Sequence, residues 1–400
     1  MTSYVMTLAT PDNTGASRMA CQFGRALAKR GHRVVVAHGP IPRDAQGTPA
    51  ESVLPAMHEA GIETHLEPRL AFPLSPRLSR DVANLAGRVG AEAIVGVNQR
   101  DRAVALQAAG RAGIAGLISA QNQHRFWGPR PIAWMKEKFY ASVVRRHARL
   151  VVCTSKVVQD EFVTRFGLPI SKTVTLQNAI QVANFPEYSA VAIDNVRQSL
   201  GIDESTFMWL NVGRVDYQKG QDILIEALGH LRTTAQPWKI VVVGDVSAGP
   251  NQPRMQKYAR QFRERADALG LSDRIVFAGW RSDVPLLLRA TNGYVHAARW
   301  EGSPLAVIEA MAASCPIVTP DNAARPAGFE PGRHGLLAKA EDPISLAHRM
   351  AHMMALPVQE RSAFGTAARQ LAEADFDIAH VGSRFADLVE AHSGLGGGRN

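Results

Sequence analysis

The chain has 400 residues, 46% of them apolar and 20% charged, so it is long enough for two domains that each bury a core. Its three cysteines, Cys21, Cys153 and Cys315, are scattered without a CxxC or zinc-type spacing, which favours a reducing compartment. The net charge of +9 predicts an anionic partner, but no helix-turn-helix, zinc-finger or RNP-type signature accompanies the basic residues, which argues against nucleic acid.

The N-terminal segment 1–13, MTSYVMTLATPDN, has no basic residues ahead of its apolar run, and Pro11 and Asp12 interrupt that run. This pattern predicts a first strand rather than a signal peptide. No stretch approaches the roughly 18 apolar residues that a membrane helix needs. We therefore expect a cytoplasmic protein, either free or peripheral on the inner face of the cytoplasmic membrane.

Short apolar runs alternate with helical stretches along the chain, which is typical of parallel sheets covered by helices on both faces. The first series of expected strands is YVMTLAT (4–10), RVVVA (33–37), AIVGV (93–97), GLISA (116–120), LVVC (150–153) and TVTL (173–176). The second series is FMWLNVG (207–213), KIVVVG (239–244), RIVFAG (274–279), GYVHA (293–297) and PIVT (316–319). The sequence therefore predicts an α/β protein with two Rossmann-like, doubly wound parallel sheets.

The domains are expected at 1–190 and 200–375, with the boundary in the weakly patterned segment near 185–203. An amphipathic helix over 377–393 is expected to pack back on the first domain, and the tail GLGGGRN to be disordered. Two such sheets that face each other leave a cleft at the carboxyl ends of their strands, where α/β proteins bind ligands.

Residues 130–150, RPIAWMKEKFYASVVRRHARL, combine apolar and basic side chains in a helical pattern. Such a helix could lie on an anionic membrane and present a lipid-linked acceptor. The alternative is a helix that covers the sheet, and the pattern favours that alternative.

The segment 211–228 runs from a strand that ends in Gly213, through a loop with Arg214 and Lys219, to a helix opened by Gly220. Two cations on a glycine-flanked loop suit a diphosphate, because arginine can bind it bidentately and lysine acts as a compact charge. The alternative is a solvated basic turn.

The segment 296–319 places Glu301 on a loop after a strand and Glu309 in the helix that follows. Ser303 is expected to be the N-cap of this helix and Pro304 its first residue. Two separated carboxylates can hold two hydroxyl pairs of one elongated ligand, and the helix N-terminus between them favours phosphate. The alternative is a capped surface helix, although Glu309 stands in the apolar run LAVIEAMAA, where an unpaired carboxylate would be costly.

Together GRVDYQKG (213–220) and EGSPLAVIEAMA (301–312) resemble the family 4 retaining glycosyltransferases of GT-B fold, among them members that assemble lipopolysaccharide core or other surface glycans. The resemblance extends over nearly the whole chain. Further matching segments are TLATPDNTGASRMACQFGRALAKRGHRVVV (7–36), VVCTSKVVQDEF (151–162), LQNAI (176–180), IVVVGD (240–245) and RIVFAGWRSDVPLLLRAT (274–291).

The resemblance implies that Arg214 and Lys219 bind the donor diphosphate and stabilise its leaving charge, and that Glu309 holds the ribose. Glu301 and the GSPL backbone would hold the transferred sugar, while Arg281 would lie beside the base. The other residues assigned to donor binding are Gly15, Gly213, Gly244, Gly302, Ser303, Pro304 and Leu305.

For the acceptor, VGVNQRDRA (95–103) resembles a loop of lipopolysaccharide-core members, which makes Asn98 and Asp101 candidates. Asp101 could equally be an ordinary N-cap. His124 lies near the position of a functional histidine in the family and is a catalytic candidate, with a structural histidine as the alternative.

The resulting prediction is a retaining glycosyltransferase that takes a UDP-sugar, or a GDP-sugar, to a glycan or lipid-linked acceptor in bacterial surface polysaccharide synthesis. No metal or other cofactor is expected, because the histidines form no metal motif and the DxD at Asp375–Asp377 does not follow a credible strand. The alternative is a nucleotide-sugar-binding protein of the same fold without transfer activity. The loop DNAARPAGFEPGRHG (321–335) departs from the family pattern, which leaves the donor sugar open.

Overall fold

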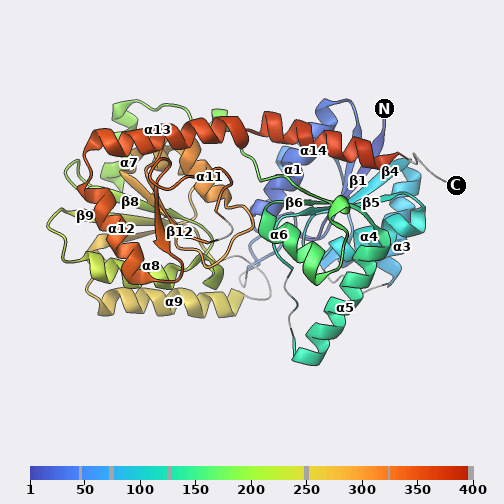
Figure 1. Ribbon diagram of the computed structural model, residues 1–400, viewed down its shortest axis with the longest axis horizontal. Coiled ribbons are helices and arrows are strands. Elements are labelled where there is room, and N and C mark those ends of the chain that lie inside the picture. The colour runs from blue at the N-terminus through green and yellow to red at the C-terminus, as the bar shows by residue number, and fades with distance from the viewer. Residues whose placement is uncertain are drawn as a thin grey trace. The chain divides into compact units, whose positions relative to one another are not determined.

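The computed structural model describes residues 1–44, 47–71, 76–124, 126, 128–246, 252–322 and 325–394, and the expected disordered tail lies, beyond Gly394, outside this range. It divides into two compact units, 1–179 with 378–400, and 180–377. Each unit is an α/β layer structure with helices on both faces of one sheet (Figure 1). In the described ranges no helix is both long and apolar enough to cross a bilayer.

The first unit contains a seven-stranded, wholly parallel sheet of order β3-β2-β1-β4-β5-β6-β7. Its strands are β1 (Ser3–Leu8), β2 (Arg33–His38), β3 (Glu63–Leu66), β4 (Ala91–Gly96), β5 (Ala115–Ala120), β6 (Ala148–Cys153) and β7 (Thr173–Thr175). Its helices are α1 (Gly15–Lys29), α2 (Leu54–Glu59), α3 (Pro76–Arg88), α4 (Arg102–Ala112), α5 (Arg130–His147), α6 (Lys156–Asp160) and α14 (Ile378–Ser393).

The second unit contains a six-stranded parallel sheet of order β10-β9-β8-β11-β12-β13. Its strands are β8 (Phe207–Val212), β9 (Trp238–Val243), β10 (Ile275–Gly279), β11 (Gly293–Val295), β12 (Ile317–Asp321) and β13 (Leu336–Lys339). Its helices are α7 (Ala190–Ser199), α8 (Gln221–Leu231), α9 (Gln252–Ala268), α10 (Val284–Ala290), α11 (Leu305–Ala312), α12 (Pro343–Ala355) and α13 (Val358–Asp375).

The expected class, two doubly wound parallel sheets, is confirmed. All eleven expected strands form, and two further strands, β3 and β13, were missed. Both missed strands are four-residue edge strands that pair on one side only. An edge strand needs no continuous apolar run, and the mostly exposed ETHL of β3 therefore gives no strand signal.

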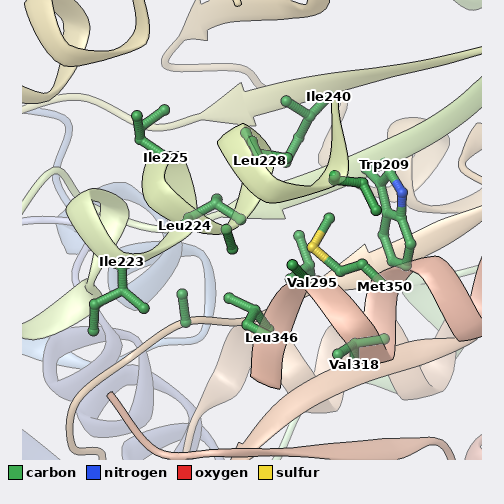
Figure 2. Packing of buried hydrophobic residues seen from close by; sticks show 14 of the residues in the cluster. Trp209, Ile223, Leu224, Ile225, Leu228, Ile240, Val295, Val318, Leu346 and Met350 are labelled. Carbon is green, nitrogen blue, oxygen red and sulfur yellow. The ribbon is translucent and has the colours of Figure 1, made fainter. Parts of the chain in front are cut away.

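The core beneath one face of the second sheet fixes the position of α8. Leu224 and Leu228 of α8 are almost completely buried and belong to one cluster with Trp209 of β8 and Met350 of α12. Figure 2 shows these side chains meeting between the two helices and the sheet. Burial of such side chains stabilises the fold by about 1.5–3 kcal/mol each, so α8 holds the loop that precedes it firmly in place.

The division between the units corrects the expected boundary. Residues 180–190, which we assigned to the first domain, belong to the second unit. Ile180 donates its N–H to the carbonyl of Phe376, and the carboxylate of Asp377 accepts the N–H of Val182. Sequence patterns do not predict these bonds, because the bonded residues are far apart in the chain. The bonds give Asp377, the last residue of the DxD triplet, a structural role.

The C-terminal helix α14 contacts α1 of the first unit. The rings of Phe385 and Phe23 are stacked with centroids 3.9 Å apart. Arg30, at the end of α1, forms ion pairs with Asp387 at 2.7 Å and Glu390 at 3.0 Å. The chain thus returns to its first unit after completing the second.

Candidate functional site

The second sheet reverses its strand order between β8 and β11, and loops after these strands meet at its carboxyl edge. Gly220, with φ +67°, begins α8 so close to the β11 loop that a Cβ atom would lie 2.1 Å from the carbonyl oxygen of Ala297. Gly244, with φ +131°, approaches Gly213 equally closely, since a Cβ would lie 1.9 Å from the Gly213 carbonyl oxygen. The two glycines are required by close backbone contact, which draws the loops together.

Lys219 and Glu301 meet across these loops. The Nζ atom of Lys219 donates to Oε1 of Glu301 at 2.5 Å, and Gln218 Nε2 donates to Oε2 at 3.3 Å. The side chains of Lys219 and Glu301 are only 18% and 9% exposed, so the pair is shielded from water on most sides. The expected convergence of these two residues is therefore observed.

Glu301 is held ionised by its surroundings. Burial alone would raise the pKa of this carboxyl, but Lys219 and the nearby His296 lower it to about 2. His296 is 3% exposed, and its Nε2 atom lies 3.3 Å from Oε1 of Glu301. Neither ring nitrogen of His296 makes a hydrogen bond to the part of the chain that is described.

Glu309 lies in α11 and is 6% exposed. Burial raises the pKa of the Tyr294 hydroxyl, and the charges of Glu309 and Glu301 raise it further. That hydroxyl lies 3.4 Å from the carbonyl oxygen of Val212, the last residue of β8. The phenol of Tyr294 therefore lies at the end of β8.

The start of α11 differs from the prediction. The helix begins at Leu305, and Pro304, with φ −77° and ψ 96°, occupies the N-cap position without a side-chain cap. Ser303 is thus not the N-cap, since Pro304 has the extended backbone that this position requires. Gly302, Ser303 and Pro304 are all buried next to Glu301, while Leu305 is half-buried.

The other two expected cations are less enclosed. The side chain of Arg214 is 43% exposed, and its Nη1 atom lies 3.7 Å from Asp216. Arg281 directs its guanidinium fork at Asp283, with Nε and Nη2 donating at 2.8 and 2.6 Å. Arg214 therefore lies on the Lys219 loop with much of its side chain open to solvent, whereas Arg281 already has an anionic partner.

In the first unit, Asp101 occupies the N-cap position of α4, as one of the two sequence-based interpretations predicts. It is 0% exposed, and its carboxylate accepts bonds from Thr7 Oγ1 at 2.9 Å, Ala9 N at 2.7 Å and Val97 N at 3.0 Å. It makes no side-chain cap on α4. The carboxylate instead joins the ends of β1 and β4 and has no exposed surface, and its proposed contact with an acceptor stays a prediction. Desolvation raises the pKa of this carboxyl to about 7, against these hydrogen bonds.

The remaining candidates also lie in the first unit. Asn98 is half-buried after β4, and its Oδ1 atom is buried without a hydrogen-bond partner in the described structure. Gly15 is the exposed first residue of α1. Their proposed contacts with acceptor and donor stay predictions.

His124 lies in an aromatic cluster. Its ring is 4.4 Å from that of Phe126 and 4.1 Å from that of Tyr140, centroid to centroid. Desolvation, followed by the charges of Arg102 and Arg165, lowers the pKa of His124 well below its usual value. Burial thus favours the neutral form of the imidazole, and a catalytic role for it stays a prediction.

Three residues of the site in the second unit were not predicted from the sequence, and they are Tyr294, His296 and Arg299. Tyr294 lies in β11 and His296 directly follows it, so the two side chains point to the same face of the strand. This spacing of two, just before Glu301, is the signal that could have identified them. Arg299 had no such signal, because its partners Tyr217, Asp222 and Glu341 lie in other segments of the chain. In the described ranges no group of three or more His, Cys, Asp or Glu side chains is arranged to hold a metal ion.

Comparison with known families covers both units. Residues 13–184 match the family described as Glycosyltransferase Family 4, and residues 192–371 match Glycosyl transferases group 1. Together the two matches leave out only the termini and the short segment 185–191 near the start of the second unit.

Two curated relatives carry lipopolysaccharide names. The chain is 31% identical to the lipopolysaccharide core biosynthesis mannosyltransferase LpsB of Rhizobium meliloti, over 51% of this chain and 50% of LpsB. It is also 31% identical to the lipopolysaccharide core biosynthesis mannosyltransferase LpcC of Rhizobium leguminosarum bv. viciae, over 45% of this chain and 47% of LpcC. The alignments thus span about half the length of each relative.

Solved structures share the fold. Anabaena Alr3699/HepE in complex with UDP and glucose superposes with a TM-score of 0.80 at 20% identity, over 97% of this chain and 99% of that one. WaaG, a glycosyltransferase involved in lipopolysaccharide biosynthesis, superposes with a TM-score of 0.68 at 19% identity, over 99% and 100% of the two chains. At these identities the likeness establishes the GT-B fold alone.

Proposed function

Because this chain belongs to the group 1 glycosyltransferases, we propose that it transfers a sugar from a nucleotide diphosphate donor to a glycan or lipid-linked acceptor. A UDP-sugar is favoured over a GDP-sugar, and transfer retains the anomeric configuration without a metal ion. The observation that carries the proposal is the enclosed contact of Lys219 with Glu301 where the second sheet reverses its strand order.

The site suits the departure of a nucleoside diphosphate. Negative charge grows on the leaving diphosphate, and fixed cations that oppose it stabilise the transition state in a shielded site. Glu301 holds Lys219 in place, and the more exposed Arg214 lies on the same loop, so the site offers the phosphate oxygens one fixed cation and one accessible cation. A guanidinium and an ammonium together provide the bidentate and point contacts that a diphosphate accepts.

Glu301 and Glu309 would bind the two ends of the donor. Glu301, ionised down to about pH 2, would accept hydrogen bonds from hydroxyls of the transferred sugar. Glu309 would accept bonds from the ribose hydroxyls. When the donor is fixed in this way, the binding energy offsets part of the entropy that would otherwise be lost in reaching the transition state.

Retention of configuration follows from attack on the same face from which the diphosphate leaves. The leaving phosphate would accept the proton of the acceptor hydroxyl, so no enzymic nucleophile is needed. The names of LpsB and LpcC support a lipopolysaccharide-type acceptor, and the UDP of HepE supports a uridine donor.

The test is donor binding and turnover. Thermal-shift titrations with UDP- and GDP-sugars would identify the base, and donor hydrolysis or transfer would then be followed with and without EDTA. The anomeric configuration of the product is read by NMR. We expect binding and EDTA-resistant turnover for the wild type, and loss of turnover in Lys219→Ala and Glu301→Gln. Binding without turnover under any acceptor would instead favour the alternative, a nucleotide-sugar-binding protein.

A membrane contact through α5 is proposed for the acceptor side. Four of its large apolar side chains are exposed, and they are Ile132 (42%), Trp134 (64%), Met135 (60%) and Phe139 (52%). The helix also carries five Lys and Arg residues against one acidic residue. Figure 1 shows its N-terminal end projecting from the rest of its unit. An apolar, basic helix surface of this kind suits an anionic lipid interface.

Vesicle sedimentation tests this contact. The wild type is expected to bind vesicles with anionic phosphatidylglycerol more than neutral phosphatidylcholine vesicles, and Trp134→Ser with Phe139→Ser should abolish the difference. Trp280→Ser is the matched control, because Trp280 is 58% exposed but lies in the other unit. Equal binding by the α5 variant and the wild type would exclude the contact.

A further inference from the structure

Arg299 connects the loop after β11, which carries Glu301, to the loop after β8, which carries Lys219. We call this connection, made by the Arg299 side chain, the clasp. Arg299 precedes Glu301 by two residues, and its side chain is 9% exposed. Nη1 donates to Asp222 Oδ1 at 2.9 Å and Nη2 to Oδ2 at 2.7 Å, so the contact is bidentate. Asp222 stands in the first turn of α8, three residues after Lys219.

The guanidinium also holds the Lys219 loop directly. Nη1 of Arg299 donates to the carbonyl oxygen of Tyr217 at 2.8 Å, and the guanidinium carbon lies 3.8 Å from the centre of the Tyr217 ring. Nε donates to Glu341 at 3.2 Å. With its donors engaged by protein groups, the side chain of Arg299 is committed to holding structure rather than to binding a phosphate.

Main-chain and amide bonds extend the same connection. The N–H of Arg299 donates to the carbonyl of Gln218 at 2.9 Å. The side-chain amide of Gln218 donates back to the Trp300 carbonyl at 3.0 Å and to Glu301 at 3.3 Å. Lys219 and Glu301 are therefore each flanked by residues that tie one loop to the other.

The aspartate is itself fixed by a second donor. The hydroxyl of Tyr258, on α9, donates to Asp222 Oδ1 at 2.7 Å. Although burial acts to raise the pKa of Asp222, its hydrogen bonds to Arg299 and Tyr258 lower it. The clasp thus has an ionised acceptor and a rigid, planar donor, the combination that resists displacement most strongly.

We infer that Arg299 is a positioning residue for glycosyl transfer, which sets the spacing of Lys219 and Glu301 by clasping Asp222 of α8 to the loop after β11. The inference rests on the transfer activity proposed above. Its physical basis is that a displacement of about 1 Å in a reacting geometry can reduce the rate roughly 100-fold.

The experiment compares donor hydrolysis by Arg299→Met, Arg299→Lys and Asp222→Asn with the wild type. Rates are expressed per nucleotide-binding site, counted by calorimetric titration with UDP, so that a loss of folded protein does not resemble a loss of rate. Arg299→Met and Asp222→Asn should each lower kcat about 10- to 100-fold, with KM changed less than about threefold. Arg299→Lys should recover part of the rate, because it keeps the charge and loses the fork.

The double variant gives the sharper test. If Arg299 and Asp222 act as one unit, their combined replacement should lower kcat no further than either single replacement. Arg265→Met is the matched control, because Arg265 forms a similar bidentate pair with Glu226 of α8, at 2.6 and 2.9 Å, away from the loop. Its kcat should stay within about twofold of the wild type.

Wild-type kcat per site in Arg299→Met, or additive losses in the double variant, would overturn the inference and leave the proposed function standing. A wild type that neither binds nor hydrolyses nucleotide sugars would overturn the proposed function itself. Should Arg299→Met fail to fold, Asp222→Asn and Arg299→Lys decide the question by the same criteria.

Discussion

The two sheets reverse their strand order at equivalent positions, between β1 and β4 in the first unit and between β8 and β11 in the second. An acid occupies each position, and the two are used differently. Asp101 is fully buried, and it accepts three hydrogen bonds, from two backbone N–H groups at strand ends and from the Thr7 hydroxyl. Glu301 faces a lysine from the neighbouring loop.

We call the point where a parallel sheet reverses its strand order its switch point. The difference shows that a switch point is a favourable place for a ligand but does not ensure one. In the first unit the acid joins two strand ends and leaves no group of its own for a ligand. In the second, the acid and the lysine come from two different loops and form an ion pair at the carboxyl edge of the sheet. The second position is therefore where we expect chemistry, and the first where we expect stability.

The comparison predicts its largest effect at the second switch point. Lys219→Ala should lower kcat/KM for donor turnover about 100- to 1,000-fold, because a fixed cation opposite the leaving diphosphate is lost. Steady-state kinetics measures this. Lys339→Ala is the control, since Lys339 is 79% exposed and pairs with Asp342 at 3.7 Å. If the two variants were equally active, Lys219 would matter no more than an exposed surface lysine, and the second switch point would not be the site of the chemistry.

At the first switch point the expected effect is on stability. Asp101→Asn should lower the free energy of unfolding by about 3 kcal/mol at pH 8, because an amide nitrogen would face a buried N–H or O–H donor. Urea unfolding measures the loss, with Asp387→Asn, a 63% exposed acid of α14, as control. The affinity for UDP should stay unchanged, and a large loss of affinity would contradict the separation of roles.

The pH dependence of stability sharpens the contrast. The folded-state pKa of Glu301 is about 2, below its ordinary value of 4.5, so folding favours its ionised form. The resulting stabilisation, about 3 kcal/mol, is present above pH 4.5 and is lost as the pH falls toward 2. Urea titrations of wild type and Glu301→Gln should therefore converge over this range. A constant difference would show that Lys219 does not stabilise the carboxylate.

The smallest effect is expected at the exposed cation. Arg214→Lys should weaken donor affinity about tenfold or less, because lysine keeps the charge but cannot bind a diphosphate bidentately. Calorimetric titration with UDP measures it, and UMP serves as the ligand control because it lacks the second phosphate. A similar loss for both nucleotides would place Arg214 away from the diphosphate.

Much of the fold was readable because parallel strands buried on both faces leave continuous apolar runs. Runs such as KIVVVG and RIVFAG therefore located the strands, and glycine-flanked loops with unusual charge located Lys219 and Glu301. The edge strands β3 and β13 escaped because one-sided pairing demands no such run. The N-cap of α11 was misplaced by one residue because Ser303 and Pro304 carry competing signals at a helix start.

By itself, the sequence determined the two-sheet architecture and the identity of the charged loop residues, since both depend on local composition and period. The tertiary structure alone decided that Asp101 is a buried tie between strands, that His296 lies beside Glu301, and that Arg299 clasps Asp222. Asp101 contacts Thr7 and Ala9, and Arg299 contacts Asp222, across 77 to 94 positions of the chain. The energy of burying these charges is therefore set by partners that are distant in sequence.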